Sequence, residues 1–119
     1  MLKHEHIRNQ LISSLNILSD IQKQSEFWGK DQKYDVGDPD FDMIMHLFLD
    51  DYPLDNDPSS AIGWFLKDEI EAKLAAEVTL AILRVQDKVG RTGQPHQYIT
   101  HPLWEKVVEA AQKASNLIK

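Results

Sequence analysis

Cysteine is missing from the 119-residue chain, which excludes a disulfide-stabilised scaffold, a cysteine-ligated zinc site and a thiol nucleophile. Long apolar runs are missing too. The longest run late in the chain covers residues 80–83, far short of the roughly 18 residues of a membrane span. Polar residues interrupt the stretch 11–18, so we expect no signal-peptide core there. These absences predict a cytoplasmic protein without a membrane segment.

Basic residues are few relative to acidic ones. The chain has 13 Lys and Arg against 19 Asp and Glu, a formal net charge of −6. A general nucleic-acid binder needs a basic surface, so this balance argues against that class of protein. Apolar residues make up 42% of the chain, which is too many for a disordered protein. The length predicts a single domain over residues 1–119, because a second domain would have too little interior of its own.

Apolar residues recur at helical spacing along most of the chain and predict an all-α, mainly helical domain. A short buried turn or extended piece is expected at residues 62–66, with Gly63 as its flexible point. Trp28, Trp64 and Trp104 each adjoin an apolar stripe, so all three are expected in the core. The four principal helices are expected at residues 4–26, 39–50, 69–89 and 101–119.

Residues that suit helix ends stand at several of these predicted boundaries. Asp57 and Asp68 are typical N-caps, because a carboxylate accepts hydrogen bonds from the first backbone N–H groups of a helix. Asp68 together with Glu71 resembles a capping box. Gly90 is expected to end the third helix, since glycine readily adopts the left-handed conformation found there. Thr100 is the expected cap of the last helix.

One acidic segment carries the net charge of the chain. Residues 31–57 contain nine aspartates and one lysine, whereas the rest of the chain has 12 basic and 10 acidic residues. Caps and first helical turns explain some of these aspartates. Asp50, Asp51 and Asp55 lie at or beyond the end of the second predicted helix, where the helix dipole disfavours negative charge. Together with Tyr52, they form the predicted partner-binding turn, which we call the acidic turn.

The same region suggests a metal site as an alternative. Asp42, His46 and Asp50 recur four residues apart on the second predicted helix, and Asp51 follows directly. Carboxylate and imidazole groups can hold a transition metal. Three ligands from one straight helix rarely converge on one ion, so a solvated polar face is the simpler interpretation.

A complete catalytic or cofactor motif is not found. The opening of a calcium loop at residues 38–42 is followed by Met43, where that loop requires glycine. Asp68-x-x-Glu71 resembles half of the magnesium-binding motif of helical nucleotide pyrophosphohydrolases, but the second acidic pair is missing. We therefore assign no catalytic residue, expect no cofactor and favour a role other than catalysis.

Residues 47–71, LFLDDYPLDNDPSSAIGWFLKDEIE, combine an aromatic and acidic turn, a Ser/Ala-Ile-Gly segment and an acidic helix start. This pattern resembles one found in small uncharacterised bacterial helical proteins, which are similar to the immunity proteins carried beside secreted toxins. The resemblance covers about a fifth of the chain. It implies a helical fold and a protein partner, and it brings no catalytic residue.

Three hypotheses about function follow. In the first, the chain is a non-catalytic protein-binding domain, immunity or antitoxin-like in one concrete form, that docks a basic protein surface through the acidic turn. In the second, it is a metal-dependent helical hydrolase that uses the aspartate cluster. In the third, it is a homodimeric structural or regulatory protein that uses the small-residue face of the last helix.

Overall fold

The computed structural model describes residues 3–20, 22, 24, 41–51, 54, 57–90 and 95–118. Within these residues the secondary structure is helical apart from an isolated bridge between Ile62 and Leu66, which confirms the predicted mainly helical fold. None of the described helices is both long enough and apolar enough to cross a lipid bilayer. The elements in chain order are α1 (Glu5–Leu18), α3 (Phe41–Met45), the π-helical turn η1 (His46–Asp51), the 3-10 turn η2 (Pro58–Ala61), α4 (Glu69–Val89), α5 (Pro95–Ile99) and α6 (Trp104–Leu117).

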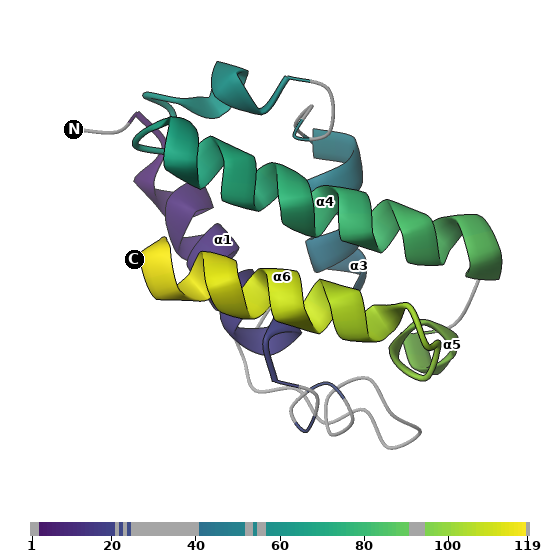
Figure 1. The fold of residues 1–119 in the computed structure, drawn as a ribbon. Helices are drawn as coiled ribbons and strands as arrows, with labels where there is room; N and C mark the ends of the chain where they lie inside the picture. The colour runs from purple at the N-terminus through teal and green to yellow at the C-terminus, as the bar shows by residue number, and fades with distance from the viewer. Residues whose placement is uncertain are drawn as a thin grey trace.

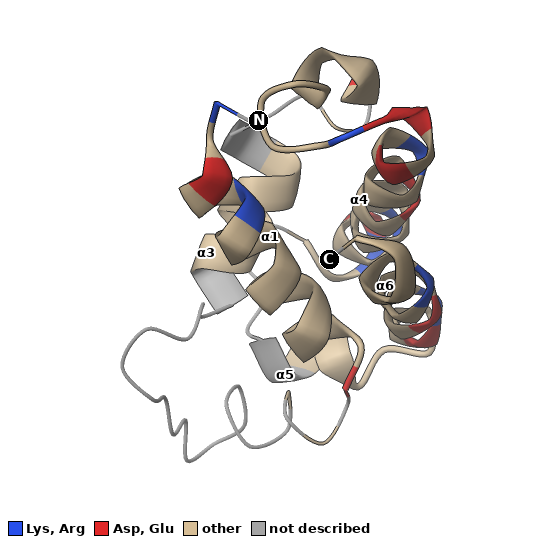
Figure 2. Ribbon diagram, turned by 90° about the vertical axis from the view of Figure 1, so that its left-hand side faces the viewer, with Lys and Arg blue, Asp and Glu red and all other residues tan. Residues whose placement is uncertain are grey.

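The helices form two layers. In one layer α4 and α6 lie side by side and run in opposite directions, as their colours show in Figure 1. Figure 2 shows α1 and α3 together on the other side of the molecule. The core lies between the layers, where α1 packs against α6, and η1 and η2 pack against α4. Its fully buried side chains include Leu11, Leu15, Leu18, Ile44, Phe48, Val78, Ile82, Val85, Val107, Ala111 and Ala114.

The first helix is shorter than the predicted range of residues 4–26. It ends at Leu18, with Ser19 as its C-cap. The carboxylate of Asp20 then accepts a hydrogen bond from the backbone N–H of Gln22 at 3.0 Å. An aspartate in this arrangement opens a new turn and competes with continuation of the helix. The prediction of one uninterrupted helix was therefore wrong at Ser19 and Asp20.

A buried glutamine supports the end of α1. Gln24 has no exposed surface, and its amide Nε2 donates hydrogen bonds to the carbonyls of Ile17 at 2.9 Å and Leu18 at 2.8 Å. Its Oε1 accepts a hydrogen bond from the indole Nε1 of Trp104 at 2.7 Å. The last carbonyls of a helix lack partners within the helix, so this side chain stabilises the break and links it to α6.

The bounds of α4 agree with the predicted helix at residues 69–89. Asp68 is its N-cap and accepts a hydrogen bond from the backbone N–H of Glu71 at 2.9 Å. Gly90 is its C-cap with φ +95°, a conformation that side-chain-bearing residues rarely adopt. The predicted apolar stripe is correct in its middle but wrong at Ile70, whose side chain is 63% exposed. Within the first turn of α4, Ile70 points to the surface whereas Glu71 and Ala72 are buried.

The segment before α4 departs from two predictions. Asp57 precedes η2, but its side chain makes no cap hydrogen bond; its backbone carbonyl instead accepts from the N–H and Oγ of Ser60. Trp64 is 46% exposed, so its predicted core position was wrong, whereas Trp104 is buried and Trp28 lies outside the described residues. Gly63 has φ +86° at the tip of the turn, as expected for its flexible point.

The last helix begins three residues later than the predicted start at residue 101. Thr100 does not cap it; Leu103 is the N-cap residue and makes no cap hydrogen bond through its side chain. The Nδ1 of His101 accepts a hydrogen bond from the N–H of Leu103 at 3.1 Å. On the small-residue face proposed for dimerisation, Ala111 and Ala114 are fully buried within the chain, whereas Ala110 is only partly buried.

A short helix, α5, precedes α6 in a stretch predicted as loop. Pro95 occupies its first position, where the missing N–H of proline carries no penalty. Tyr98 is buried, and its hydroxyl donates a hydrogen bond to the carbonyl of Gly90. This contact ties α5 to the end of α4, and the burial of Tyr98 explains why the segment is ordered as a helix.

Candidate functional site

The helical segment that carries the candidate aspartates, α3 with η1, is anchored to the body through one face. Ile44, Leu47 and Phe48 are buried in the core, and Leu54 beyond the segment is buried as well. Met43 and His46 are exposed. The apolar face therefore holds this segment against α4, and its other face points away from the core.

The metal hypothesis depends on the alignment of residues within η1. The prediction placed His46 and Asp50 one turn apart, because residues four apart are aligned in an α-helix. In the structure His46, Asp50 and Asp51 all lie in the π-helical turn, where backbone hydrogen bonds join residues i and i+5. The side chains of Asp42, Asp50 and Asp51 lie outside the described part of the chain, so their alignment with His46 stays a prediction.

The predicted site residues fall only partly within the described structure. Asp42, Asp50 and Asp51 lie on the helical segment, but their side chains are outside the described part of the chain, as are Tyr52 and Asp55 entirely. Among the side chains that are described, no three His, Asp or Glu residues form a group that could hold a metal ion. The aspartates of the candidate metal site are not among those side chains.

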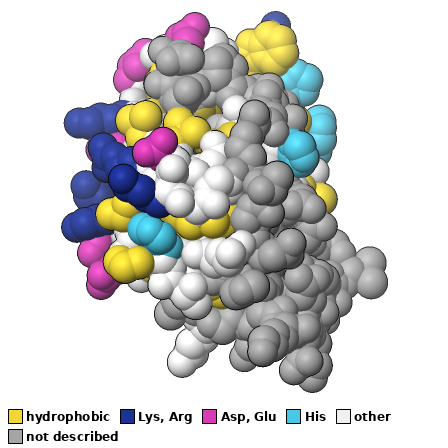
Figure 3. All heavy atoms as spheres, turned by 90° about the vertical axis from the view of Figure 1, so that its right-hand side faces the viewer, with side chains coloured by type: hydrophobic (Ala, Val, Ile, Leu, Met, Phe, Trp, Pro, Cys, Tyr) yellow, Lys and Arg dark blue, Asp and Glu magenta, His cyan; other side chains and the backbone are white. Residues whose placement is uncertain are grey.

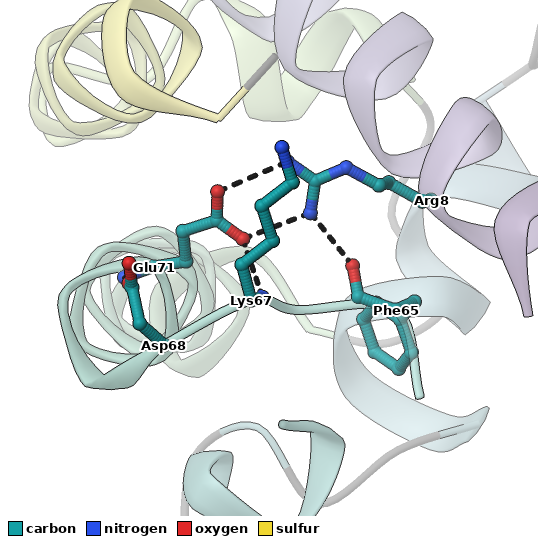
Figure 4. Close-up of polar contacts among 5 residues, drawn as sticks. All are labelled: Arg8, Phe65, Lys67, Asp68 and Glu71. Atoms are coloured by element: carbon teal, nitrogen blue, oxygen red, sulfur yellow. Dashed lines mark hydrogen bonds and ion pairs between the residues drawn. The ribbon is translucent and has the colours of Figure 1, made fainter. Parts of the chain in front are cut away.

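A buried ion pair joins the two layers, as Figure 4 shows. The guanidinium of Arg8 on α1 meets the carboxylate of Glu71 on α4 through two hydrogen bonds, of 2.8 Å from Nη1 and 3.0 Å from Nη2. Nη1 of Arg8 also donates to the carbonyl of Phe65 at 2.9 Å. Oε1 of Glu71 accepts from the backbone N–H of Lys67 at 2.7 Å. The pair connects α1, the turn at residues 62–66 and the start of α4.

The two charges shift the pKa of each other. Burial favours a raised pKa for Glu71, but the hydrogen bonds from Arg8 and Lys67 and the positive charge of Arg8 outweigh it and lower that pKa. The hydrogen bond to Glu71 raises the pKa of Arg8, although burial opposes the shift. Both groups are therefore charged at neutral pH, and the pair belongs to the framework of the fold.

The ion pair was not predicted from the sequence, although the sequence contains a signal for it. Arg8 lies three residues before Leu11 and seven before Leu15, on the stripe that α1 buries. A charge on a buried stripe needs a partner of opposite sign, since an unpaired buried charge is very costly. The sequence patterns placed Glu71 in a capping box and in half of a magnesium-binding motif, but not in an ion pair. In the structure it reaches back to the N–H of Lys67 and also neutralises Arg8.

An exposed aromatic cluster lies at the N-terminal end of α1. The backbone N–H groups of Lys3 and His4 donate to the carbonyls of Gly63 and Trp64, at 3.3 and 2.8 Å. The imidazole of His4 stacks on the indole of Trp64 with ring centres 5.0 Å apart, and His6 meets His4 edge-on at 5.9 Å. Hydrogen bonding and stacking together explain the ordered position of this half-exposed tryptophan.

A groove runs between the outer faces of α4 and α6, away from α1 and α3. Its volume is about 440 Å³, and Leu80, 43% exposed, lies on its α4 side. In Figure 3 the face of α4 and α6 forms the left edge, where Lys and Arg side chains gather with hydrophobic side chains between them. The residues that line the groove are Glu77, Leu80, Ala81, Arg84, Lys106, Glu109, Ala110 and Lys113.

The sequence model of one protein family, "Domain of unknown function (DUF7945)", matches residues 2–119, almost the full length. The chain belongs to the DUF7945 family. No curated protein and no solved structure matches it. Membership of DUF7945 brings no activity, substrate or partner with it, so the function has to be argued from the residues of the chain itself.

Proposed function

We propose that this DUF7945 protein is a non-catalytic protein-binding domain of the cytoplasm that docks a basic protein partner through the acidic turn of Asp50, Asp51, Tyr52 and Asp55. An immunity or antitoxin-like role is one concrete form of this function. The charge distribution carries the proposal: residues 31–57 have nine acidic residues and one basic residue, whereas the rest of the chain is close to neutral.

The anchoring of α3 and η1 supports the proposal. Their apolar residues Ile44, Leu47 and Phe48 are buried, so the backbone that leads into the acidic turn is attached to the core. An anchored acidic segment accelerates encounter with a basic surface through long-range attraction. Like charges this close repel one another, and a basic partner relieves that repulsion.

The use of the buried polar side chains supports a role other than catalysis. An active site generally needs polar groups directed at a substrate in a pocket. Here the buried polar side chains of the described residues bond to the framework instead. These side chains are Arg8 and Glu71 in the ion pair, Gln24 with Trp104, Ser14 with the carbonyl of Gln10, and Thr79 with the carbonyl of Ala75.

A triple variant of the acidic turn tests the proposal. The changes Asp50→Asn, Asp51→Asn and Asp55→Asn should leave the melting temperature unchanged or slightly higher, because they remove repulsion. The same changes should slow association with a partner isolated from the source cell. For the wild type, association should also slow as salt rises, because the Debye length shrinks from about 10 Å at 0.1 M to about 3 Å at 1 M.

A second triple variant separates the position of the charge from its amount. Glu5→Gln, Asp87→Asn and Glu105→Gln remove the same number of acidic charges at exposed positions on α1, α4 and α6. This variant should associate nearly as fast as the wild type. If both triple variants bind equally fast and equally tightly, the acidic turn is solvated surface and the proposal is wrong.

A further inference from the structure

The groove between α4 and α6 presents charges of both signs around an exposed apolar centre. Leu80 is 43% exposed in the middle of α4, and the small side chains of Ala81 and Ala110 line the groove beside it. Glu77 lies three residues before Leu80, and Arg84 lies four residues after it. An apolar centre flanked by one acid and one base is complementary to a second copy of the same surface.

We infer that this groove is the interface of a homodimer in which α4 of one copy packs antiparallel against α4 of the other. A two-fold axis between Leu80 and Ala81 makes residues at equal distances from that point face each other. Glu77 of each copy then faces Arg84 of the other, and the two Leu80 side chains meet the small Ala81 and Ala110 near the axis. Such a contact is isologous, as in most symmetric dimers.

The helical register brings these side chains onto one face. Glu77 and Arg84 are seven residues apart, which is about two turns and about 10 Å along the axis of α4. Residues at this spacing lie on the same side of a helix. In an antiparallel pair of helices, the two Glu77–Arg84 contacts form at the same time, one on each side of the apolar centre.

The side chains of Glu77 and Arg84 can both form an ion pair with a second copy of the chain. Arg84 has no hydrogen bond or ion pair with any residue in the described part of the chain. Glu77 contacts Lys113 at 4.0 Å, and the two side chains are 37% and 72% exposed. An exposed pair at that distance contributes little. In the dimer, the guanidinium of Arg84 in one copy can donate two N–H hydrogen bonds to the carboxylate of Glu77 in the other copy.

The remaining cations of the groove stay at the edge of this contact. Lys106 and Lys113 are on α6 and are 66% and 72% exposed. They can remain solvated beside the central α4 pair. α4 is about 31 Å long and α6 packs beside it, so the face available to a second copy extends over both helices. A stable interface needs roughly 800 Å² per partner.

The dimer face is distinct from α3 and η1, which lead into the acidic turn, because these two elements belong to the other layer of the molecule (Figures 1 and 2). It also differs from the dimer expected from the sequence, which was centred on the small residues of α6. Ala111 and Ala114 are fully buried within the chain, so α6 contributes only Ala110 beside the central pair of α4 helices.

Charge reversal on α4 tests the dimer by sedimentation velocity. We expect the wild type to be dimeric at about 100 µM, since interfaces of standard size have dissociation constants of micromolar or below. Glu77→Arg places cations opposite cations, and Arg84→Glu places anions opposite anions, so each single variant should dissociate at least tenfold more easily. An equimolar mixture of the two variants should form a heterodimer, and the double variant Glu77→Arg/Arg84→Glu should form a homodimer again.

Two control variants and a fold measurement complete the design. Glu5→Arg on α1 and Lys67→Glu before α4 reverse exposed charges away from the α4–α6 face and should leave the dimer intact. Helical circular dichroism should be the same for all variants. A monomeric wild type at about 100 µM overturns the inference. Dimeric single variants show that α4 is not at the interface, and a mixture that stays monomeric refutes the antiparallel register.

Discussion

Neutralising Glu71 should destabilise the protein far more than neutralising an acidic residue only two positions away. In Glu71→Gln the side-chain oxygen can still accept from the N–H of Lys67, but the guanidinium of Arg8 keeps its charge without a counter-charge. Both side chains of the pair are more than nine-tenths buried. Removing one partner of a buried ion pair typically costs about 3–5 kcal/mol, because an uncompensated charge remains in the interior.

The matched control is Glu69→Gln. Glu69 lies in the same first turn of α4 but is exposed, and it accepts a hydrogen bond from Ser59 at 2.9 Å. Both substitutions remove one negative charge from the helix N-terminus, an effect of about 0.3–1 kcal/mol. The difference in free energy of unfolding between the two variants therefore measures the contribution of the buried pair, and we expect it to be about 2–4 kcal/mol.

Urea unfolding followed by circular dichroism measures these free energies, and thermal unfolding provides a second reading. For 119 residues, an unfolding entropy of about 2.1 cal/mol/K per residue converts 1 kcal/mol into about 4 °C of melting temperature. Glu71→Gln should therefore melt at least about 10 °C below the wild type. Arg8→Met should lower the free energy of unfolding by a similar amount. The double variant Arg8→Met/Glu71→Gln should lose less free energy of unfolding than the sum of the two single variants, because no buried charge remains.

The difference between the wild type and Glu71→Gln should also depend on pH. Because the pKa of Glu71 is lowered in the folded state, the stability from its ionised form is fully present above the ordinary carboxyl pKa of about 4.3. That contribution is lost as the pH falls through the lowered folded-state pKa. The difference in free energy of unfolding between the wild type and Glu71→Gln should therefore become smaller as the pH falls. The role assigned to the pair would be refuted if Glu71→Gln and Glu69→Gln lowered the free energy of unfolding by the same amount. It would also be refuted if the losses caused by Glu71→Gln and Arg8→Met simply added in the double variant.

Three further predictions concern the core, the helix caps and the metal hypothesis. Leu74→Ala should cost about 2–5 kcal/mol in urea unfolding, since Leu74 is buried on α4; a loss below about 0.5 kcal/mol contradicts that burial. Asp68→Ala should cost about 0.5–2 kcal/mol through loss of its cap bond, whereas Asp57→Ala should be nearly neutral because its side chain caps nothing. Titration calorimetry with magnesium, manganese and zinc should show no stoichiometric site; tight binding that His46→Ala abolishes would favour the hydrolase hypothesis instead.

Local signals in the sequence were enough to predict the elements whose ends depend on neighbouring residues. Asp68 and Gly90 mark both ends of α4, because N-cap bonding and positive φ are properties of a few adjacent residues. Gly63 marks the turn before α4 for the same reason. The charge asymmetry is equally a property of the sequence, and it locates the proposed binding turn without any contact in the fold.

The tertiary structure decided what depends on residues far apart in the chain. The break after Leu18, which Asp20 opens locally, is stabilised by Gln24, which bonds to the last carbonyls of α1 while accepting from Trp104, a partner 80 residues away. Arg8 can lie in the core only because Glu71 faces it across the layers. The outward position of Leu80 on α4 likewise depends on how α6 packs beside it. The periodicity of apolar residues identifies an apolar stripe on a helix. Only the packing of the helices determines which part of that stripe is buried, because burial depends on residues from other parts of the chain.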